Sequence, residues 1–483
     1  MEVFRINITG GILHTHQLKA IAEVCQQNSL NYITLGSRQE IYLQVDDNTR
    51  TKQIFQRLKE IKVNFELNSD LFPNIVTSYA SQDIFNNTPW LNEGIYLEIL
   101  DSISHKPRLK INIIDGQQPL FPFFTGHLNF IASELPHYWF LYIRFPKQHH
   151  LNLWPRLIYS TGISSLSRAL DEIIKTNRIR DFQTVLKLGE ENCVYLGKDH
   201  KYTNVNLPIL ELPNYEGFHQ MSENLWLGIY MRNNLYSSDF MHEFASLCES
   251  IEIPVICLTP WKSLLIKRIT PTQQKTIQSL FNQYGVNIHH AGSELCWIIE
   301  DNNEQAENIK QTIVNHLYQH DVNTSGLIFG IRFEKTHQLP SNVIIEKQED
   351  LNYTIYYTEH FIPFNHNLIL HKENLSASEL PEAIEQLCRF YHKTGKSKKE
   401  KSHMTYKENA EIQNNTNVAS YTIYQCQDCH TIYDPLIGDK MQGIPPNTPF
   451  ETMINFTCYL CNAPQSRFKP VEAKQIYAIQ RSI

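Results

Sequence analysis

The sequence Cys426-Gln427-Asp428-Cys429 is followed, after 28 intervening residues, by Cys458-Tyr459-Leu460-Cys461. Each stretch is a C-x2-C pair, and two such pairs on tight turns bring four thiolates together in a tetrahedral site that suits iron or zinc. Zinc ribbons usually separate their pairs by about 15–20 residues, so the longer interval and its content favour iron. We therefore predict four metal ligands: Cys426, Cys429, Cys458 and Cys461.

The segment around these pairs carries the turns and aromatic residues of a known family. Its turns include Tyr433-Asp434-Pro435 and Gly443-Ile444-Pro445-Pro446, and five aromatic residues accompany the cysteines: Tyr424, Tyr433, Phe450, Phe456 and Phe468. Residues 420–472 resemble rubredoxin, a small electron carrier with one iron. The resemblance implies one Fe bound by the four cysteines, cycling between Fe3+ and Fe2+ and packed against an aromatic core.

The segment departs from the rubredoxin pattern at several positions. His430 and Asn462 stand where rubredoxins usually keep glycine, and both residue types are among those that tolerate a left-handed backbone. Phe456 replaces the usual tryptophan before the second pair, and Tyr459 replaces the usual proline. All four cysteines remain, so the resemblance still implies an iron site, with altered solvent access and potential.

Composition limits the classes of function that fit the chain. It has 483 residues, 42% of them hydrophobic and 19% charged, as is ordinary for a globular protein of several domains. A net charge of −7 gives no sign of a nucleic-acid or membrane partner. Residues 1–5 lack the charged head of a signal peptide, and no apolar run approaches about 18 residues. We expect a cytoplasmic protein.

The N-terminal residues predict a small α+β unit. Residues 3–8 alternate as a strand does, Gly10 and Gly11 interrupt the pattern, and residues 14–26 place apolar side chains on one helical face. Two further strands and a second helix are expected at 32–35, 41–45 and 54–61. The order β-α-β-β-α matches a ferredoxin-like half domain.

The same pattern returns 223 residues later without a gap. Residues 3–25 lie over residues 226–248, and apolar positions coincide: Leu18 with Met241, Ile21 with Phe244, and Cys25 with Cys248. A register kept across helices and strands indicates a duplication. A longer segment follows each half domain and ends in a strand and an amphipathic helix, with strands expected at 109–114, 139–145, 327–333 and 353–357 and helices near 164–174 and 377–391.

The order of these parts, and several short stretches, resemble the siroheme nitrite and sulfite reductases. Thr9-Gly10-Gly11 resembles the family's Pro-Gly-Gly turn, and Thr34-Leu35-Gly36-Ser37-Arg38-Gln39 resembles its Leu-Thr-x-Arg-Gln stretch. Residues 106–111 resemble a segment of its siroheme-binding region. The resemblance covers residues 1–392 and implies that Arg38 faces a siroheme carboxylate, although a buried or surface ion pair explains this arginine equally well.

The departures from that family change the expected function. The family holds a [4Fe–4S] cluster with C-x5-C and C-x3-C motifs, and cysteine is the usual ligand of such a cluster. Residues 1–392 contain neither motif, and Asn7 replaces the family's substrate-binding arginine. We expect neither siroheme nor [4Fe–4S], no catalytic residues and no active siroheme reductase. The six remaining cysteines are expected to be buried thiols: Cys25, Cys193, Cys248, Cys257, Cys296 and Cys388.

We therefore predict an α+β protein with duplicated ferredoxin-like half domains, reductase-like segments and a rubredoxin-like domain. Its parts are half domain 1 (1–66), reductase-like segment 1 (67–215), half domain 2 (216–289), reductase-like segment 2 (290–392), a flexible lysine-rich linker (393–419) and the rubredoxin-like domain (420–475). The expected function is one-electron transfer between redox partner proteins, a donor and an acceptor, in a pathway such as nitrite or nitrate assimilation. The alternative is a non-catalytic scaffold or binding module with a structural metal site, such as zinc.

Overall fold

The computed structural model separates the chain into two compact units, Met1–Thr394 and Gly395–Ile483. It describes all residues except 86, 149, 200–211, 213, 334–338, 349–351, 359–367, 394–421, 428–431, 434, 436–437, 440–441, 443, 446–447, 454–455, 459–462 and 473–483. The predicted linker lies outside the described residues apart from Lys393. We call the first unit the body and describe each unit by itself.

The body begins with the first predicted half domain. Helix α2 starts where the Asp47 carboxylate accepts hydrogen bonds from the backbone N–H groups of Thr49 and Arg50, which satisfies free donors of the first turn. The elements are β1 (Glu2–Asn7), η1 (Thr9–Gly11), β2 (Ile12–His14), α1 (Thr15–Gln27), β3 (Tyr32–Leu35), β4 (Glu40–Val45), α2 (Asn48–Glu60) and β5 (Phe65–Leu67).

The second half domain repeats this order, preceded by β13 (Gly217–Met221). Its elements are β14 (Asn224–Ile229), η4 (Arg232–Asn234), β15 (Tyr236–Ser237), α6 (Ser238–Ser250), β16 (Val255–Thr259), β17 (Ser263–Ile269) and α7 (Pro271–Tyr284). Both bounds of α6 and both bounds of η4 lie 223 residues after those of α1 and η1. The predicted duplication is confirmed.

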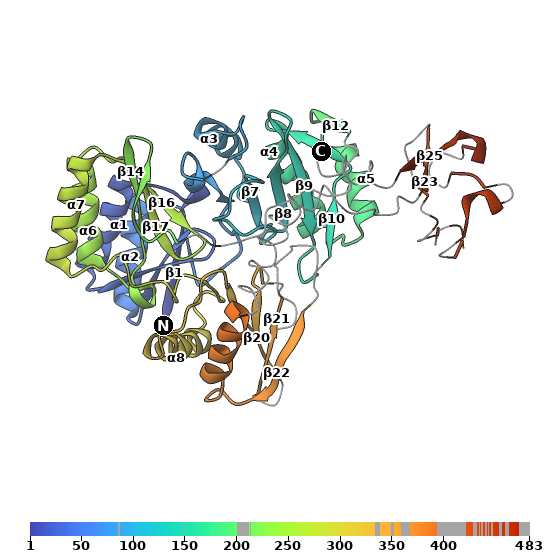
Figure 1. Cartoon of the computed structure of the whole chain (residues 1–483). Helices are drawn as coiled ribbons and strands as arrows, with labels where there is room; N and C mark the ends of the chain where they lie inside the picture. The colour runs from blue at the N-terminus through green and yellow to red at the C-terminus, as the bar shows by residue number, and fades with distance from the viewer. Residues whose placement is uncertain are drawn as a thin grey trace. The chain divides into compact units, whose positions relative to one another are not determined.

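The two half domains exchange their shortest strands. One sheet has the order β15-β3-β4-β1-β5 and the other β13-β14-β17-β16-β2, so each half lends a strand of two or three residues to the sheet of the other. Helices α1 and α6 lie side by side (Figure 1) and share one buried core, which includes Leu18, Ile21, Met241 and Phe244.

The segment after half domain 1 forms a seven-stranded sheet. The predicted strands and helix are found as β7 (Ile111–Ile114), β9 (Tyr138–Arg144) and α4 (Gly162–Asp171), which continues into a π-helical turn (Glu172–Thr176). The other elements are β6 (Val76–Thr77), η2 (Tyr79–Ser81), α3 (Glu93–Ser102), β8 (Leu128–Ala132), β10 (Leu151–Leu153), β11 (Arg156–Tyr159), α5 (Phe182–Asn192) and β12 (Gly197–Asp199).

The segment after half domain 2 forms a five-stranded sheet, β18-β19-β20-β21-β22, with its own core. The sequence predicted β19 (Phe329–Arg332), β21 (Tyr353–Tyr357) and the closing helix, which runs over 380–393. It did not predict β18 (Trp297–Ile298), α8 (Glu304–Gln319), β20 (Val343–Lys347) or β22 (Ile369–Leu375). Among the described helices, none is long and apolar enough to cross a membrane.

The second unit contains a three-stranded sheet in the order β24-β23-β25. Its elements are β23 (Thr422–Cys426), β24 (Ile432–Tyr433), η5 (Phe450–Thr452), η6 (Gln465–Arg467) and β25 (Phe468–Glu472). Gly438 has a φ of 72°, and a Cβ there would lie 2.5 Å from the carbonyl oxygen of Ile444. Glycine therefore permits the tight turn in which Asp439 and Ile444 exchange backbone hydrogen bonds.

Candidate functional site

Two of the four predicted metal ligands lie in the described part of the second unit. Cys426 ends β23 and pairs with Phe468 of β25, while Cys458 donates its backbone N–H to the carbonyl of Ala463 at 2.8 Å. Both cysteines are fully buried and belong to one core cluster. Cys429 and Cys461 lie outside the described residues, so the complete ligand set stays a prediction.

An interlocked aromatic core surrounds the two cysteines. The rings of Tyr424 and Phe450 stack at 4.1 Å, and Phe456 lies 5.3 Å from Phe468 and 5.5 Å from Tyr433, measured between ring centroids. The Tyr433 hydroxyl donates to the carbonyl of Thr448 at 2.7 Å, which satisfies its polar group. The predicted aromatic core is confirmed, and Cys426 and Cys458 are buried in it.

Soft thiolate donors in an apolar core fit a thiophilic metal such as iron or zinc. Burial of a thiolate without a counter-charge is costly, and a bound cation removes that cost. The donor set therefore fits the iron that the sequence predicts.

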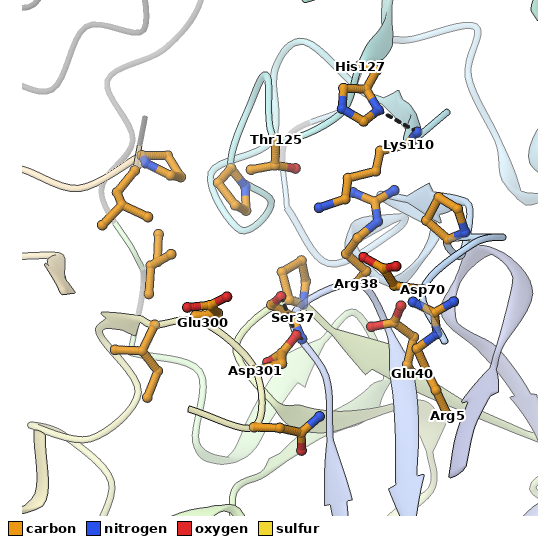
Figure 2. Close-up of a pocket in the computed structure, with 18 of the residues that line it drawn as sticks. Arg5, Ser37, Arg38, Glu40, Asp70, Lys110, Thr125, His127, Glu300 and Asp301 are labelled. Carbon is orange, nitrogen blue, oxygen red and sulfur yellow. Dashed lines mark hydrogen bonds between the residues drawn. The ribbon is translucent and has the colours of Figure 1, made fainter. Parts of the chain in front are cut away.

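The body contains a cavity of about 690 Å³, lined by half domain 1 and by both longer segments. Ser37, Arg38 and Lys110 line it, so two stretches that resemble siroheme reductases meet here. Figure 2 shows Arg38, Lys110 and His127 on one side of the cavity and Glu300 and Asp301 on the other. Asn7 is not part of the lining; its side-chain amide donates to the carbonyl of Phe72 at 2.9 Å.

The guanidinium of Arg38 is hydrogen-bonded to other residues of the protein. Its guanidinium donates to the carbonyls of Asn74 and Ile111, at 2.7 and 3.1 Å, and to the side-chain oxygen of Asn112 at 3.1 Å. Burial lowers the pKa of Arg38 to about 10. This arrangement fixes the turn between β3 and β4 against β7, which gives Arg38 a structural role.

Lys110 and Arg144 form a basic cluster on the same wall, beside His127. Burial lowers the pKa of Lys110, as does repulsion from Arg38, and burial also lowers the pKa of Arg144. No ion pair joins the Lys110 ammonium to a carboxylate among the described residues. Burial, followed by repulsion from Lys110 and Arg144, lowers the pKa of His127 to about 2, so its neutral ring accepts the Lys110 backbone N–H at 2.9 Å.

Acidic residues face this cluster. Asp301 accepts from the Ser37 backbone N–H and hydroxyl at 2.9 and 2.7 Å, and it pairs with the Lys262 ammonium at 3.1 Å. Glu40 is buried, and burial, together with repulsion from Asp301, raises its pKa to about 7. The cavity therefore has a cationic wall and a partly neutralised acidic wall.

The sequence prediction missed most of the cavity. Lys110, His127 and Arg144 stand beside or at the ends of the buried strands β7, β8 and β9. Charged residues at the ends of consecutive apolar strands were the available signal. The sequence does not show that these three residues meet at one edge of the sheet, because that depends on strand direction. Strands β7 and β8 run parallel, whereas β8 and β9 run antiparallel.

The body cysteines are divided among three cores. Cys25 and Cys248 lie in the half-domain core, Cys193 and Cys257 in the core of the first long segment, and Cys296 and Cys388 in that of the second. Burial raises the pKa of Cys25, Cys248, Cys296 and Cys388 to about 12, so these four thiols stay protonated.

Comparison with known proteins matches the body and the C-terminal segment to two different families. The family model for the nitrite/sulfite reductase ferredoxin-like half domain matches residues 2–61. The solved structure of the Mycobacterium tuberculosis NirA protein superposes with a TM-score of 0.63 at 13% identity, covering 80% of each chain. At that identity the likeness shows the fold alone: the chain carries a NirA-like α+β fold.

The C-terminal segment has closer relatives. The rubredoxin family model matches residues 423–468. A probable rubredoxin-1 of Methanocaldococcus jannaschii is 40% identical over 55 residues, which are 11% of this chain and 69% of the relative. A probable rubredoxin HupI of Bradyrhizobium diazoefficiens is 39% identical over 57 residues, 12% of this chain and 83% of the relative. Through this segment, joined to a nitrite/sulfite reductase-like body, the chain belongs to the rubredoxin family.

Proposed function

We propose that this protein is a one-electron carrier whose rubredoxin domain exchanges electrons with a reductase. The observation that supports the proposal best is the burial of Cys426 and Cys458 in one aromatic core within a rubredoxin domain. Cys426, Cys429, Cys458 and Cys461 would hold the iron. Iron held by four thiolates supplies exchange of one electron between ferric and ferrous states.

The residues of the domain tune and insulate that exchange. The aromatic cluster of Tyr424, Phe450, Phe456 and Phe468 keeps water from the thiolates, and burial favours the form with less negative charge. The short sheet fixes the backbone at Cys426, because Gln427 donates its N–H to the carbonyl of Arg467 at 2.9 Å. A rigid ligand set limits the reorganisation that accompanies electron transfer.

The body is proposed to serve as a docking part without a [4Fe–4S] cluster or siroheme. A cubane cluster needs four ligands at one place, and the six body cysteines lie two by two in three separate cores. Arg38 is already held by three protein acceptors. Because the body has the fold of NirA, we propose that it retains an interface to a nitrite or sulfite reductase.

The test has two arms. Full-length protein purified from cells supplied with iron and zinc should contain about one iron per chain and show the visible absorption of a ferric thiolate centre. The reduced protein, mixed with the siroheme nitrite reductase of its own organism, should be reoxidised faster when nitrite is present. Zinc in place of iron would reject the carrier function. A reoxidation rate that does not change when the reductase and nitrite are added would reject this partner.

A second candidate function is a binding module for a small anion, and the cavity favours it. The Lys110 ammonium and the Arg144 guanidinium line the cavity, and neither forms an ion pair among the described residues. An oxyanion there would gain charge-assisted hydrogen bonds. Nitrite, sulfite and phosphate should each be tested by calorimetry with the full-length protein and with Lys110→Gln. Equal affinity of wild type and Lys110→Gln for these anions would show that the cavity is not their binding site.

A further inference from the structure

Two histidines and a glutamate meet on the surface of the second long segment. His316 lies in the last turn of α8 and His320 is the residue that caps its C-terminal end, so the two imidazoles stand about one turn apart. Glu385 belongs to the helix over 380–393. The two helices are held together by a shared core that includes Ile313, Leu317 and Ile384.

The three side chains converge on one carboxylate oxygen. Oε2 of Glu385 lies 2.7 Å from Nε2 of His316 and 2.6 Å from Nδ1 of His320. The two imidazole centroids are 4.0 Å apart, and the three ligand atoms all lie within 4.8 Å of one another. Two imidazole nitrogens and a carboxylate oxygen therefore already point at one small volume.

This donor set matches a divalent transition metal. Zinc bonds to histidine nitrogen and carboxylate oxygen are about 2.0–2.2 Å, which places tetrahedral ligand atoms about 3.3 Å apart. Each nitrogen would have to move less than about 1 Å from Glu385, and the side chains have room because His316 is 23% and His320 48% exposed. Exposure on that side leaves a fourth position for water.

Arg389 supports the carboxylate from behind. Its Nε donates to the second oxygen of Glu385, Oε1, at 2.8 Å, and its Nη2 donates to the carbonyl of His320 at 3.2 Å. A hydrogen bond to the non-ligating oxygen is the usual way to orient a metal-binding carboxylate. Arg389 thus turns Oε2 toward the histidines.

We propose that His316, His320 and Glu385 form a binding site for Zn²⁺ or a similar divalent transition metal, with one coordination position open to solvent. The site uses residues of the body alone and does not depend on the electron-transfer function. Bound metal would join α8 to the helix over 380–393, so it would raise the stability of this segment as well as bind.

The experiment is a zinc titration of the full-length, iron-loaded protein after removal of loosely bound metal with a chelator. Wild type should bind one equivalent of Zn²⁺ more than His316→Gln/His320→Gln, and zinc should raise the melting temperature of wild type but not of this double variant. Arg389→Gln should retain the site with about tenfold weaker affinity, as expected for loss of a supporting hydrogen bond. Any zinc that replaces iron in the thiolate centre is the same for wild type and variants, so it does not affect the difference in bound zinc between them.

His242→Gln is the matched control. His242 also lies beside carboxylates, 3.5 Å from Glu23 and 3.4 Å from Glu243, but it is not grouped with a second histidine among the described residues. It should bind zinc as wild type does. Should the double variant lose its fold, His320→Gln alone is measured and should bind at least about tenfold more weakly. Equal zinc binding by wild type and the variants of His316 and His320 would overturn the proposal and leave a hydrogen-bonded cluster of two histidines and a glutamate.

Discussion

The side-chain amide of Asn234 hydrogen-bonds both backbone groups of Leu35: it accepts the N–H at 3.0 Å and donates to the carbonyl at 2.9 Å. In the other half, Leu258 is bound by a different side chain: the amide of Gln39 donates to the Leu258 carbonyl at 2.7 Å. Leu35 and Leu258 occupy matching positions in the duplicated register. The two halves are therefore clamped at matching places by side chains that are not themselves repeats.

Asn234→Asp is expected to destabilise the body by about 2–3 kcal/mol. The aspartate would keep the acceptor for Leu35 N–H but would place a buried carboxylate oxygen against the Leu35 carbonyl. Asn234→Gly should cost less, about 1–2 kcal/mol, because it loses the bonds but suits the φ of 58° at this residue. Urea unfolding followed by circular dichroism measures both. A glycine variant less stable than the aspartate variant would contradict the clamp.

Neither half domain should fold by itself. A fragment of residues 1–66 would lack β15 beside β3 and would expose the α1 face that packs against α6, including Leu18 and Ile21. Burial of such side chains contributes about 1.5–3 kcal/mol each, so the loss of several is comparable to the stability of a small domain, about 5–15 kcal/mol. We expect no cooperative thermal transition from 1–66, whereas 1–393 should show one. A cooperative transition in the short fragment would refute this expectation.

Cys458→Ser is expected to remove most of the iron and the visible absorption of the rubredoxin domain. Serine replaces a soft thiolate with a hydroxyl, which is a poor iron ligand at neutral pH. Cys388→Ala is the control, since Cys388 is a buried thiol of the body and should leave the iron content unchanged. Metal analysis with the visible spectrum checks both. Iron retained at the wild-type level in Cys458→Ser would remove that residue from the ligand set.

The sequence predicted those features that rest on local pattern. The bounds of α1 reappear in α6 because the same apolar spacing recurs, and Cys426 and Cys458 fall in one core as the paired motifs require. Helix α8 was missed although Ile309, Ile313 and Leu317 carry its four-residue spacing. That miss also hid the pair His316 and His320.

Other features depend on tertiary contacts that no local pattern encodes. Strands β2 and β15 have three and two residues, too few to show alternation, and each pairs with a strand of the opposite half domain, far away in the sequence. The cavity draws Arg38, Lys110 and Asp301 from three separate parts of the chain. Arg38 illustrates this: its guanidinium donates to the backbone carbonyls of Asn74 and Ile111 and to the side chain of Asn112, contacts that its local sequence does not reveal.

Glu40→Gln is expected to stabilise the body above pH 7 and to have little effect near pH 4.5. Burial raises the pKa of Glu40 from 4.5 to about 7, so the folded state holds a proton that the unfolded state releases. Stability linked to this group is therefore present below pH 4.5 and lost as the pH rises through 7. A shift of this size corresponds to about 3 kcal/mol, because each pKa unit is worth about 1.36 kcal/mol.

The measurement is the melting temperature of the body from about pH 4.5 to about pH 8 for wild type and Glu40→Gln. The difference should grow as the pH rises and level off above about pH 7. Glu98→Gln, on the exposed face of α3, removes the same formal charge and serves as the control. A difference independent of pH would mean that Glu40 is either ionised or neutral throughout. In either case Glu40 would not exchange a proton in this pH range, and the raised pKa would be wrong.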